Sequence, residues 1–358
     1  MPTPNTFSSL GLRAELLGNL AEIDYREMTL VQAETLPRVL AGSDVLARAK
    51  TGSGKTAAFG LGVLNKLQTD AFRVQALVLC PTRELADQVA REIRRLARSL
   101  PNIKILTLCG GAPMGGQLAS LQHSPHIIVG TPGRVLKHLG KGTVDLANLQ
   151  TLVLDEADRM LDMGFSDELD AILTFVPAKR QTLLFSATYP EAIAAISDKV
   201  QRDAIIIDVT DDEQAAQITQ YWCEVTRENR CADLLGTIRE WGGALNLVFC
   251  NTKIDCADVA VYLKANGIVG LALHGDLDQK QRNEVLVRFA NRSASVLIAT
   301  DVAARGLDVD DIDAVFNYEL PPQPEVYTHR IGRTARAGKK GLAVSLVEPR
   351  EARRLLDI

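Results

Sequence analysis

The sequence contains little of what marks several large classes of protein. Its six cysteines form no Cys-x-x-Cys pair and show no metal-ligand spacing with histidine, which argues against a zinc site. Most of them lie inside apolar segments, where a thiol behaves as a small buried hydrophobe and fits a reducing compartment. Low-complexity tracts and short repeats are also absent, which argues against disordered, collagen-like and solenoid chains and predicts a globular protein.

Long hydrophobic runs are absent as well. No segment approaches the roughly 18 consecutive apolar residues of a membrane span. The first residues, MPTPNTFSSLGLRAELL, lack the basic start and the long apolar stretch of a signal peptide. We therefore expect a cytoplasmic protein with no membrane partner.

The charge balance shows no overall basic excess, because the formal net charge is −4. Residues 330–340 contain five basic residues and no acid, and residues 91–98 contain four arginines and one glutamate. The second cluster fits a solvated helix face as well as it fits a nucleic-acid surface. Local charge, and not net charge, must therefore carry any case for a nucleic-acid partner.

Apolar segments of strand length alternate with helical patterns along the chain. Their continuous apolar character predicts parallel sheets that are covered on both faces. The length of 358 residues favours two domains, and acid-rich polar sequence after residue 207 interrupts the pattern. We expect an α/β protein of two tandem doubly wound parallel-sheet domains, residues 1–207 and 217–358, with a linker at 208–216. The predicted strands are 45–47, 76–80, 103–108, 126–129, 151–154, 182–185 and 205–207, then 245–249, 269–273, 296–299, 314–316 and 342–347.

A glycine-rich segment between a predicted strand and a predicted helix has the composition of a phosphate-binding loop. It reads Ala49-Lys50-Thr51-Gly52-Ser53-Gly54-Lys55-Thr56. Glycines let backbone N–H groups surround an oxyanion, Lys55 can reach the β- and γ-phosphates, and Thr56 offers a hydroxyl to Mg²⁺. The first position is alanine where the general pattern has glycine, so the segment alone is also compatible with a glycine-rich turn.

Two acids, Asp155 and Glu156, follow an apolar strand about 100 residues later. Ligands bind at the carboxyl edge of open α/β sheets, so Asp155 is placed to hold Mg²⁺ through water and Glu156 to orient an attacking water. An acid pair at a strand end is by itself more often a helix N-cap. Its combination with the phosphate-loop pattern favours an ATPase.

The acid pair extends into Asp155-Glu156-Ala157-Asp158, the motif for which DEAD-box helicases are named. Other segments resemble the signatures of this family in type and order between about Phe7 and Gly338. They are PTRELA (81–86), GG (110–111), TPGR (131–134), SAT (186–188), ARGLD (304–308) and HRIGRT (329–334). The resemblance implies two RecA-like domains, ATP and Mg²⁺ as cofactors, and RNA-stimulated ATP hydrolysis that drives local unwinding of short RNA duplexes.

The resemblance also implies an ATP site drawn from both domains. Gln32 matches the family's adenine reader, and its acceptor and donor fit adenine N6–H₂ and N7 but mismatch guanine O6. The rings of Phe7 and Tyr25 match aromatics that can stack on the base, whereas Asp24 and Met28 replace a customary Gly and Pro. The implied ATP-binding residues are Phe7, Tyr25, Gln32, Thr51, Gly52, Ser53, Gly54, Lys55, Thr56, Gly306 and Asp308.

The arginines of the second domain match residues that stabilise the transferring phosphoryl group. Such an arginine, supplied when domains close, is worth roughly 10³–10⁵ in rate. His329 matches a residue that links this motif to the acidic motif, through Asp158 or Ser186, and Ala335 replaces a frequent glycine as a mild change. The implied catalytic residues are Lys55, Asp155, Glu156, His329, Arg333 and Arg336; the implied coupling residues are Asp158, Ser186 and Thr188.

RNA is the partner that the resemblance implies. The matching positions are Thr82, Arg83, Gly111, Thr131, Gly133, Arg134, Thr252, Gly275, Gln279, Arg282 and Thr300. Hydroxyls, glycine N–H groups and arginines position a backbone without reading bases, so we expect little sequence specificity. The preference for RNA over DNA rests on the resemblance alone.

Two other functions stay open. A nucleotide-gated RNA clamp would close on RNA and recruit partners with little unwinding, and a DNA helicase of a related superfamily is disfavoured by Gln32 and the acidic motif. Residues 121–129 resemble most closely the bacterial members that act in ribosome assembly and carry an additional C-terminal RNA-binding domain. We therefore expect rRNA or pre-ribosomal particles as partners of a monomer, and the sequence leaves the presence of that additional domain open.

Overall fold

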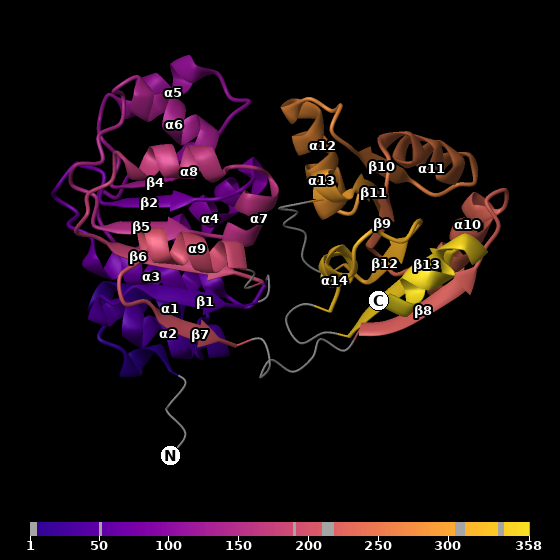
Figure 1. Cartoon of the computed structure of the whole chain (residues 1–358), viewed down its shortest axis with the longest axis horizontal. Coiled ribbons are helices and arrows are strands. Elements are labelled where there is room, and N and C mark those ends of the chain that lie inside the picture. Colours follow the sequence, from indigo (N-terminus) through magenta and orange to yellow (C-terminus); the bar gives the residue numbers. More distant parts are fainter. Residues whose placement is uncertain are drawn as a thin grey trace. The chain divides into compact units, whose positions relative to one another are not determined.

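The structure of the chain is a computed structural model that describes residues 6–49, 52–188, 191–209, 218–304, 312–335 and 340–357. Contacts between residues divide the chain into two compact units, Met1–Glu213 and Gln214–Ile358, called unit 1 and unit 2 below. Figure 1 shows that each unit contains its own sheet with helices packed against it.

Unit 1 is built on a sheet of seven parallel strands in the order β3-β4-β2-β5-β6-β1-β7. The strands are β1 (Val45–Arg48), β2 (Ala76–Leu79), β3 (Ile105–Leu108), β4 (Ile127–Gly130), β5 (Thr151–Leu154), β6 (Gln181–Ser186) and β7 (Ile205–Asp208). The helices are η1 (Phe7–Ser9), α1 (Ala14–Glu22), α2 (Leu30–Ala41), α3 (Lys55–Lys66), α4 (Arg83–Leu96), α5 (Met114–Leu121), α6 (Pro132–Gly140), α7 (Ala157–Asp162), α8 (Ser166–Leu173) and α9 (Glu191–Val200).

Both faces of this sheet are buried, as the continuous apolar strands predict. Successive residues of one strand enter two different apolar clusters: Val78 of β2 packs with α1, α2, α3 and α4, and Leu77 packs with α6, α7, α8 and α9. Because side chains alternate across a strand, a strand that contacts helices on both faces is apolar along most of its length. The sequence pattern thus determines the layered architecture.

Unit 2 repeats this plan with six parallel strands in the order β10-β11-β9-β12-β13-β8. The strands are β8 (Ile218–Glu224), β9 (Asn246–Cys250), β10 (Gly270–Leu273), β11 (Val296–Thr300), β12 (Ala314–Asn317) and β13 (Gly341–Val347). The helices are α10 (Arg230–Trp241), α11 (Lys253–Ala265), α12 (Gln279–Ala290), α13 (Asp301–Ala304), α14 (Pro324–Ile331), η2 (Pro349–Glu351) and α15 (Ala352–Asp357). The predicted fold class is therefore confirmed.

One strand, β8, escaped prediction although every predicted strand overlaps an observed one. β8 lies at the edge of its sheet and pairs only with β13 among the described strands, and most of its side chains are exposed. An exposed edge strand needs no apolar run, so the pattern used for the other strands does not detect it. Asp208, expected in the linker, is the last residue of β7, and residues 210–217 lie outside the described residues.

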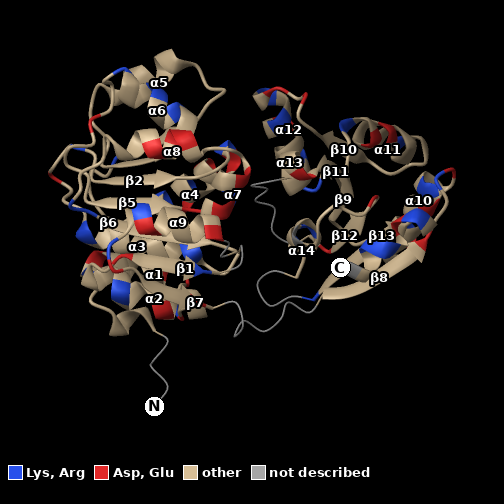
Figure 2. Ribbon diagram, viewed as in Figure 1, with Lys and Arg blue, Asp and Glu red and all other residues tan. Residues whose placement is uncertain are grey.

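Charged residues of both signs are interspersed on the helices of both units (Figure 2), for example on α10 and α12. Within the described part of the chain, no helix combines the length and the apolar character that crossing a bilayer requires.

Candidate functional site

The phosphate-loop segment connects the carboxyl end of β1 to the first turn of α3. Gly52 and Gly54 have φ values of 87° and 92°, which residues other than glycine rarely adopt. A Cβ at Gly54 would lie 2.5 Å from Gln32 Nε2, so this position has no room for a side chain. Lys55 begins α3, is 6% exposed, and donates from Nζ to the carbonyl of Ala49 at 3.0 Å. The buried ammonium and the amino end of a helix thus lie where an oxyanion would bind.

The amino end of α2 braces this loop from the side. Thr29 N donates to Gln32 Oε1 at 3.0 Å, Gln32 Nε2 donates to the carbonyl of Gly54 at 3.1 Å, and Thr29 Oγ1 donates to the carbonyl of Ser53 at 2.8 Å. Gln32 is 2% exposed. In this structure its amide therefore supports the loop, and its contact with adenine stays a prediction.

The two aromatic residues predicted beside the base lie next to each other, with ring centroids 6.1 Å apart. Phe7 is 3% exposed and belongs to the apolar core. Tyr25 is half-buried, donates from its hydroxyl to Glu92 Oε1 at 2.9 Å, and carries the guanidinium of Arg95 5.1 Å from its ring centroid. Burial, followed by the charge of Glu92, raises the pKa of Tyr25 to about 12. Stacking of either ring on a base stays a prediction.

The acid pair follows β5 directly and is buried. Glu156 has φ 53° and ψ 52°, a left-handed conformation that is costly for a glutamate and that concentrates at functional sites. Its carboxylate pairs with Arg159 Nη1 at 2.8 Å. Asp155 is 3% exposed, and among the described residues its Oδ1 atom has no hydrogen-bond partner. Burial raises the pKa of Asp155 to about 6, against the opposing effect of Lys55.

These residues fit a bound Mg²⁺. A buried carboxylate oxygen without a partner is costly in the protein alone, and a cation would satisfy it. Thr56, the second residue of α3, is half-buried beside Lys55. No group of three or more His, Cys, Asp or Glu in the described ranges could hold a metal by itself. Mg²⁺ would therefore be held jointly by the protein and nucleotide phosphates, as is usual for this ion.

The three predicted coupling residues lie together. Asp158 Oδ2 accepts hydrogen bonds from Ala187 N at 3.1 Å, Thr188 N at 3.0 Å and Thr188 Oγ1 at 3.0 Å. Ser186 Oγ donates to the carbonyl of Thr188 at 2.6 Å. A single carboxylate on α7 thus accepts three hydrogen bonds from the turn that follows β6 and ties the acidic motif to the SAT segment.

The RNA positions predicted in unit 1 follow β2, β3 and β4, which are neighbours in the sheet. Thr82 caps α4 and accepts from Leu85 N at 3.3 Å. Gly111 has φ 81°, and a Cβ there would lie 1.8 Å from Arg83 Nη1, so the guanidinium packs against the glycine backbone. Thr131 is the N-cap residue of α6. Backbone N–H groups, hydroxyls and an arginine therefore share this part of the edge.

Sequence reasoning missed the residue that holds Arg134 in place. Arg134 Nη1 donates to Gln117 Oε1 at 2.7 Å and to the carbonyl of Ala112 at 3.0 Å, and Gln117 Nε2 donates to the carbonyl of Cys109 at 3.0 Å. His138, which is fully buried, lies 3.0 Å from the same Gln117 oxygen. Burial lowers the pKa of His138, followed by the charge of Arg134. Gln117 carries no sequence signal, because a single glutamine in a helix is usually a surface residue.

The RNA positions predicted in unit 2 lie at the carboxyl ends of β9, β10 and β11 or on α12, the helix that follows β10. Arg282 Nη2 donates to the carbonyl of Ala303 at 3.1 Å, and Ala303 N donates to Thr300 Oγ1 at 3.4 Å. Thr252 caps α11 and accepts from Asp255 N at 3.2 Å. Gln279, the first residue of α12, donates from Nε2 to Asn283 Oδ1 at 3.1 Å.

Two of the predicted RNA positions are glycines that their own units do not need. Among the described residues, nothing lies within 4 Å of a Cβ built at Gly133 or at Gly275. Neither glycine has a positive φ. Their lack of a side chain therefore has no reason inside the fold and suits a close approach from outside.

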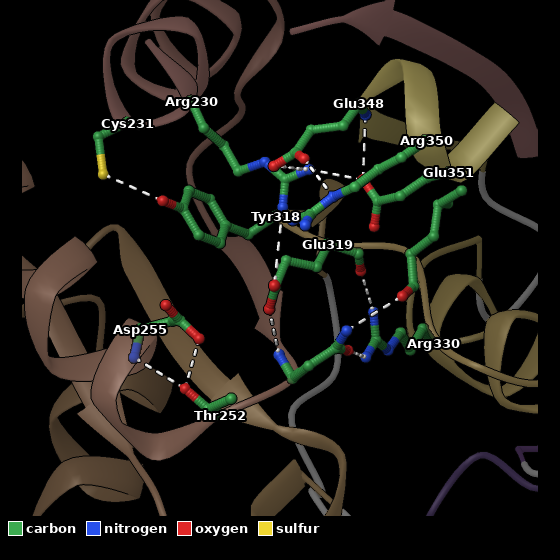
Figure 3. Close-up of polar contacts among 12 residues, drawn as sticks. Arg230, Cys231, Thr252, Asp255, Tyr318, Glu319, Arg330, Glu348, Arg350 and Glu351 are labelled. Atoms are coloured by element: carbon green, nitrogen blue, oxygen red, sulfur yellow. Dashed lines mark hydrogen bonds and ion pairs between the residues drawn. The ribbon is translucent and has the colours of Figure 1, made fainter. Parts of the chain in front are cut away.

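The arginine motif lies on α14 and just beyond it. Figure 3 shows Arg330 surrounded by polar groups of unit 2. His329 is half-buried, and Arg333 is 5% exposed. Ala335 has φ 58°, a conformation in which a Cβ is strained, so the replacement of glycine by alanine there carries a backbone cost that the sequence does not reveal. Thr51, Gly306, Asp308 and Arg336 lie outside the described residues.

Comparisons with known proteins agree with these motifs. A family model described as DEAD/DEAH box helicase matches residues 29–196, and one described as helicase conserved C-terminal domain matches residues 228–338. The chain is 59% identical to ATP-dependent RNA helicase DbpA of Escherichia coli over 97% of this chain and 76% of that protein. It is 44% identical to DEAD-box ATP-dependent RNA helicase CshA of Bacillus cereus over 99% and 67%, respectively. Among solved structures, S. cerevisiae Dbp5 bound to RNA and ADP BeF3 matches with a TM-score of 0.89 at 30% identity, over 99% of this chain and 92% of that one.

Proposed function

We propose catalytic roles for individual residues and an RNA target for this chain, which belongs to the DEAD-box family of ATP-dependent RNA helicases. Lys55 and the backbone of the phosphate loop bind the phosphates of ATP. Asp155 and Thr56 would hold Mg²⁺, which would supply positive charge at the nucleotide phosphates. Glu156 orients the attacking water.

The single observation that carries this assignment is the state of Asp155. Its carboxylate is buried at the end of β5, has an oxygen without a partner among the described residues, and is close enough to Lys55 for the ammonium to lower its pKa. Burial of such a group costs free energy, which a bound cation would offset. A Mg²⁺–nucleotide complex is the ligand whose charge and oxygen preference match.

RNA stimulates hydrolysis because the reaction needs residues from both units. Arg333 and Arg336 stabilise the γ-phosphoryl group as it transfers, and both belong to unit 2. Thr82, Arg83 and Thr131 of unit 1, with Thr252 and Thr300 of unit 2, bind one RNA strand through its backbone. A strand that contacts both units favours the state in which Arg333 reaches the nucleotide, so ATP and RNA tighten each other's binding by the same factor.

The physiological target that fits best is rRNA or a pre-ribosomal particle. Support for this choice is the similarity to DbpA and the resemblance of residues 121–129 to ribosome-assembly helicases. The protein acts as a monomer in the cytoplasm, where its free cysteines remain thiols.

The test compares ATP hydrolysis rates with single-stranded RNA, structured rRNA fragments and single-stranded DNA, alongside release of a strand from a short RNA duplex. The expected result is strong stimulation by RNA, little by DNA, and ATP-dependent strand release. Full-rate hydrolysis without any polynucleotide would contradict the proposal. Stimulation by RNA without strand release would identify a nucleotide-gated clamp instead.

A further inference from the structure

Arg330 is the largest fully buried side chain among the described residues of the protein, with 1% of its surface exposed. An arginine has five N–H donors, and here each of them has an acceptor. Nε and Nη2 donate to Asp301 Oδ1 and Oδ2 at 2.7 and 2.8 Å, and the second Nη2 hydrogen donates to Asn251 Oδ1 at 2.8 Å. Nη1 donates to the carbonyl of Glu319 at 2.7 Å and to Asn317 Oδ1 at 3.3 Å. The guanidinium also lies 5.1 Å from the ring centroid of Phe249.

These acceptors come from the carboxyl ends of three adjacent strands. Asn251 follows β9, Asp301 follows β11, and Asn317 ends β12; the sheet order places β9 between the other two. The guanidinium therefore spans the middle of the sheet edge and fixes three loops to one another. Because Arg330 belongs to α14, it fixes that helix to the same edge.

The neighbours of Arg330 in the sequence make this arrangement relevant to the reaction. Asn251 immediately precedes Thr252, and Asp301 immediately follows Thr300, the two threonines assigned to RNA. Arg330 itself follows His329 and lies three residues before Arg333. One side chain thus connects the backbone of two RNA contacts to the segment that carries the phosphoryl-stabilising arginine.

We propose that Arg330 is a positioning residue. It makes the position of Arg333 depend on the arrangement of the strand ends that bind RNA. A rigid fork with five donors suits this role, because it holds the two oxygens of Asp301 in one plane while it binds Asn251. A lysine keeps the charge but offers three donors at one point, and it cannot reproduce the fork. The inference rests on the proposed roles of Thr252, Thr300 and Arg333.

A second buried arginine in unit 2 provides a matched control. Arg230 is 4% exposed and pairs with Glu351 Oε2 at 2.5 Å and with Glu348 Oε1 at 3.2 Å, in the cluster drawn in Figure 3. Among the described hydrogen bonds and ion pairs of Arg330, none involves Glu348 or Glu351. Arg230 Nη1 also lies 3.7 Å from Glu319 Oε1, and Glu351→Gln keeps that contact. Glu351→Gln therefore weakens a buried ion pair of the same unit without removing any acceptor of Arg330.

The experiment measures, for Arg330→Lys, Asp301→Asn and Glu351→Gln, the RNA-stimulated kcat for ATP, the RNA concentration that gives half-maximal stimulation, the affinity for a fluorescent ATP analogue without RNA, and Tm. Arg330→Lys is expected to lower kcat roughly tenfold or more and to raise the half-maximal RNA concentration, because small displacements of reacting groups are costly. Its ATP affinity should stay within about twofold of wild type, since the phosphate loop belongs to unit 1. Asp301→Asn should change the same quantities in the same direction.

The control separates positioning from stability. Glu351→Gln should lower Tm by an amount comparable to Arg330→Lys and leave kcat and the half-maximal RNA concentration within about twofold of wild type. Equal kinetic losses in Glu351→Gln, or wild-type kinetics in a folded Arg330→Lys, would overturn the proposal. If Arg330→Lys does not fold, Asp301→Asn decides on the same criteria. A wild-type protein that RNA does not stimulate would instead refute the proposed function, so the two failures are distinguishable.

Discussion

Each unit buries charged side chains at the carboxyl edge of its sheet, and two of them, Asp155 and Arg330, differ in how their polar atoms are satisfied. Asp155 of unit 1 keeps an oxygen without a partner among the described residues, and burial raises its pKa to about 6. Arg330 of unit 2 has an acceptor for every N–H group. The incompletely satisfied carboxylate of Asp155 fits a bound cation, whereas the fully satisfied guanidinium of Arg330 fits a joint of the fold.

The backbone of unit 1 also differs between the part of the sheet edge that we assign to ATP and the part that we assign to RNA. The edge that we assign to ATP contains Gly52, Gly54 and Glu156, all with positive φ. Strain at Glu156 costs on the order of 1–3 kcal/mol, and it persists only where the surroundings enforce it. The part of the edge that we assign to RNA holds hydroxyls, the arginines Arg83 and Arg134, and glycines, of which Gly111 also has a positive φ, 81°. The two parts of the edge therefore differ at Glu156, where a residue with a side chain is held in the left-handed region.

The strongest test of the contrast removes one cation from each unit. Arg333→Ala is expected to lower RNA-stimulated kcat by roughly 10³–10⁵ while ATP binding stays near wild type, because that arginine acts on the transition state only. Lys55→Ala should abolish turnover and weaken ATP binding as well, because Lys55 contacts phosphates in the ground state. Steady-state hydrolysis and binding of a fluorescent ATP analogue distinguish the two patterns.

A surface arginine of unit 2 serves as the control for this pair. Arg239 is exposed on α10 and donates from Nη2 to the carbonyl of Asn266 at 2.9 Å. Arg239→Ala should leave both kcat and ATP binding within about twofold of wild type. Wild-type hydrolysis by Arg333→Ala would refute its assignment to the phosphoryl group.

The next prediction concerns stability. Asp155→Asn should raise the free energy of unfolding of the nucleotide-free protein at pH 7.5 by about 2 to 3 kcal/mol while it abolishes hydrolysis, because the ionised carboxylate is disfavoured in the fold. The pKa of Asp155 is higher in the folded state than in the unfolded state. The wild-type protein therefore loses about 2 to 3 kcal/mol of stability as the pH rises from about 4 to about 6. The advantage of asparagine should be complete above that window and absent below it. Urea unfolding in EDTA, at pH 7.5 and at a pH below that window, measures the difference in unfolding free energy between the variant and wild type.

The same unfolding measurement can be repeated with Mg²⁺ and ATP. Mg²⁺ with ATP should stabilise wild type and have a much smaller effect on Asp155→Asn, because binding to the folded state alone stabilises it. An asparagine variant that is less stable than wild type at pH 7.5 would show that Asp155 is already satisfied in the protein alone.

A smaller effect is expected at the contact between the acidic motif and the SAT segment. Thr188→Val removes one of the donors to Asp158 Oδ2 while it preserves side-chain shape. Strand release should fall roughly tenfold while RNA-stimulated hydrolysis falls less, since a hydrogen bond to a charged group contributes about 1.5 kcal/mol or more. Thr174→Val is the matched control, because Thr174 is exposed and bonds only the carbonyl of Ala171 in the described hydrogen bonds. Equal losses in release and hydrolysis would argue against a coupling role.

The fold and the motif positions follow from the sequence because both depend on local patterns. Continuous apolar strands predict both sheets, and the phosphate loop and the acidic motif are contiguous. Features that depend on long-range contact are not predictable in this way. Gln117 holds Arg134 from another helix, and the fork of Arg330 is completed by residues up to 79 positions away. The spacing of these residues along the sequence predicts neither contact.

Departures from the family pattern are instructive for the same reason. Asp24 and Ala335 both stand where family members usually have glycine, and both have positive φ, 60° and 58°. The sequence identifies the replacements but not the backbone conformation that makes them costly. Asp24 is suited to that conformation, because short polar side chains tolerate it far better than alanine does.

The smallest expected effect tests this difference between the two positions. Ala335→Gly should raise the free energy of unfolding by less than about 1 kcal/mol, because relief of the left-handed strain at Ala335 exceeds the entropy that glycine adds to the unfolded chain. Asp24→Gly should be neutral or slightly destabilising, since aspartate already tolerates the conformation and its ion pair with Arg26 is exposed. Urea midpoints of the two variants measure the contrast. A gain at Asp24 equal to that at Ala335 would mean that backbone strain, and not side-chain type, governs both sites.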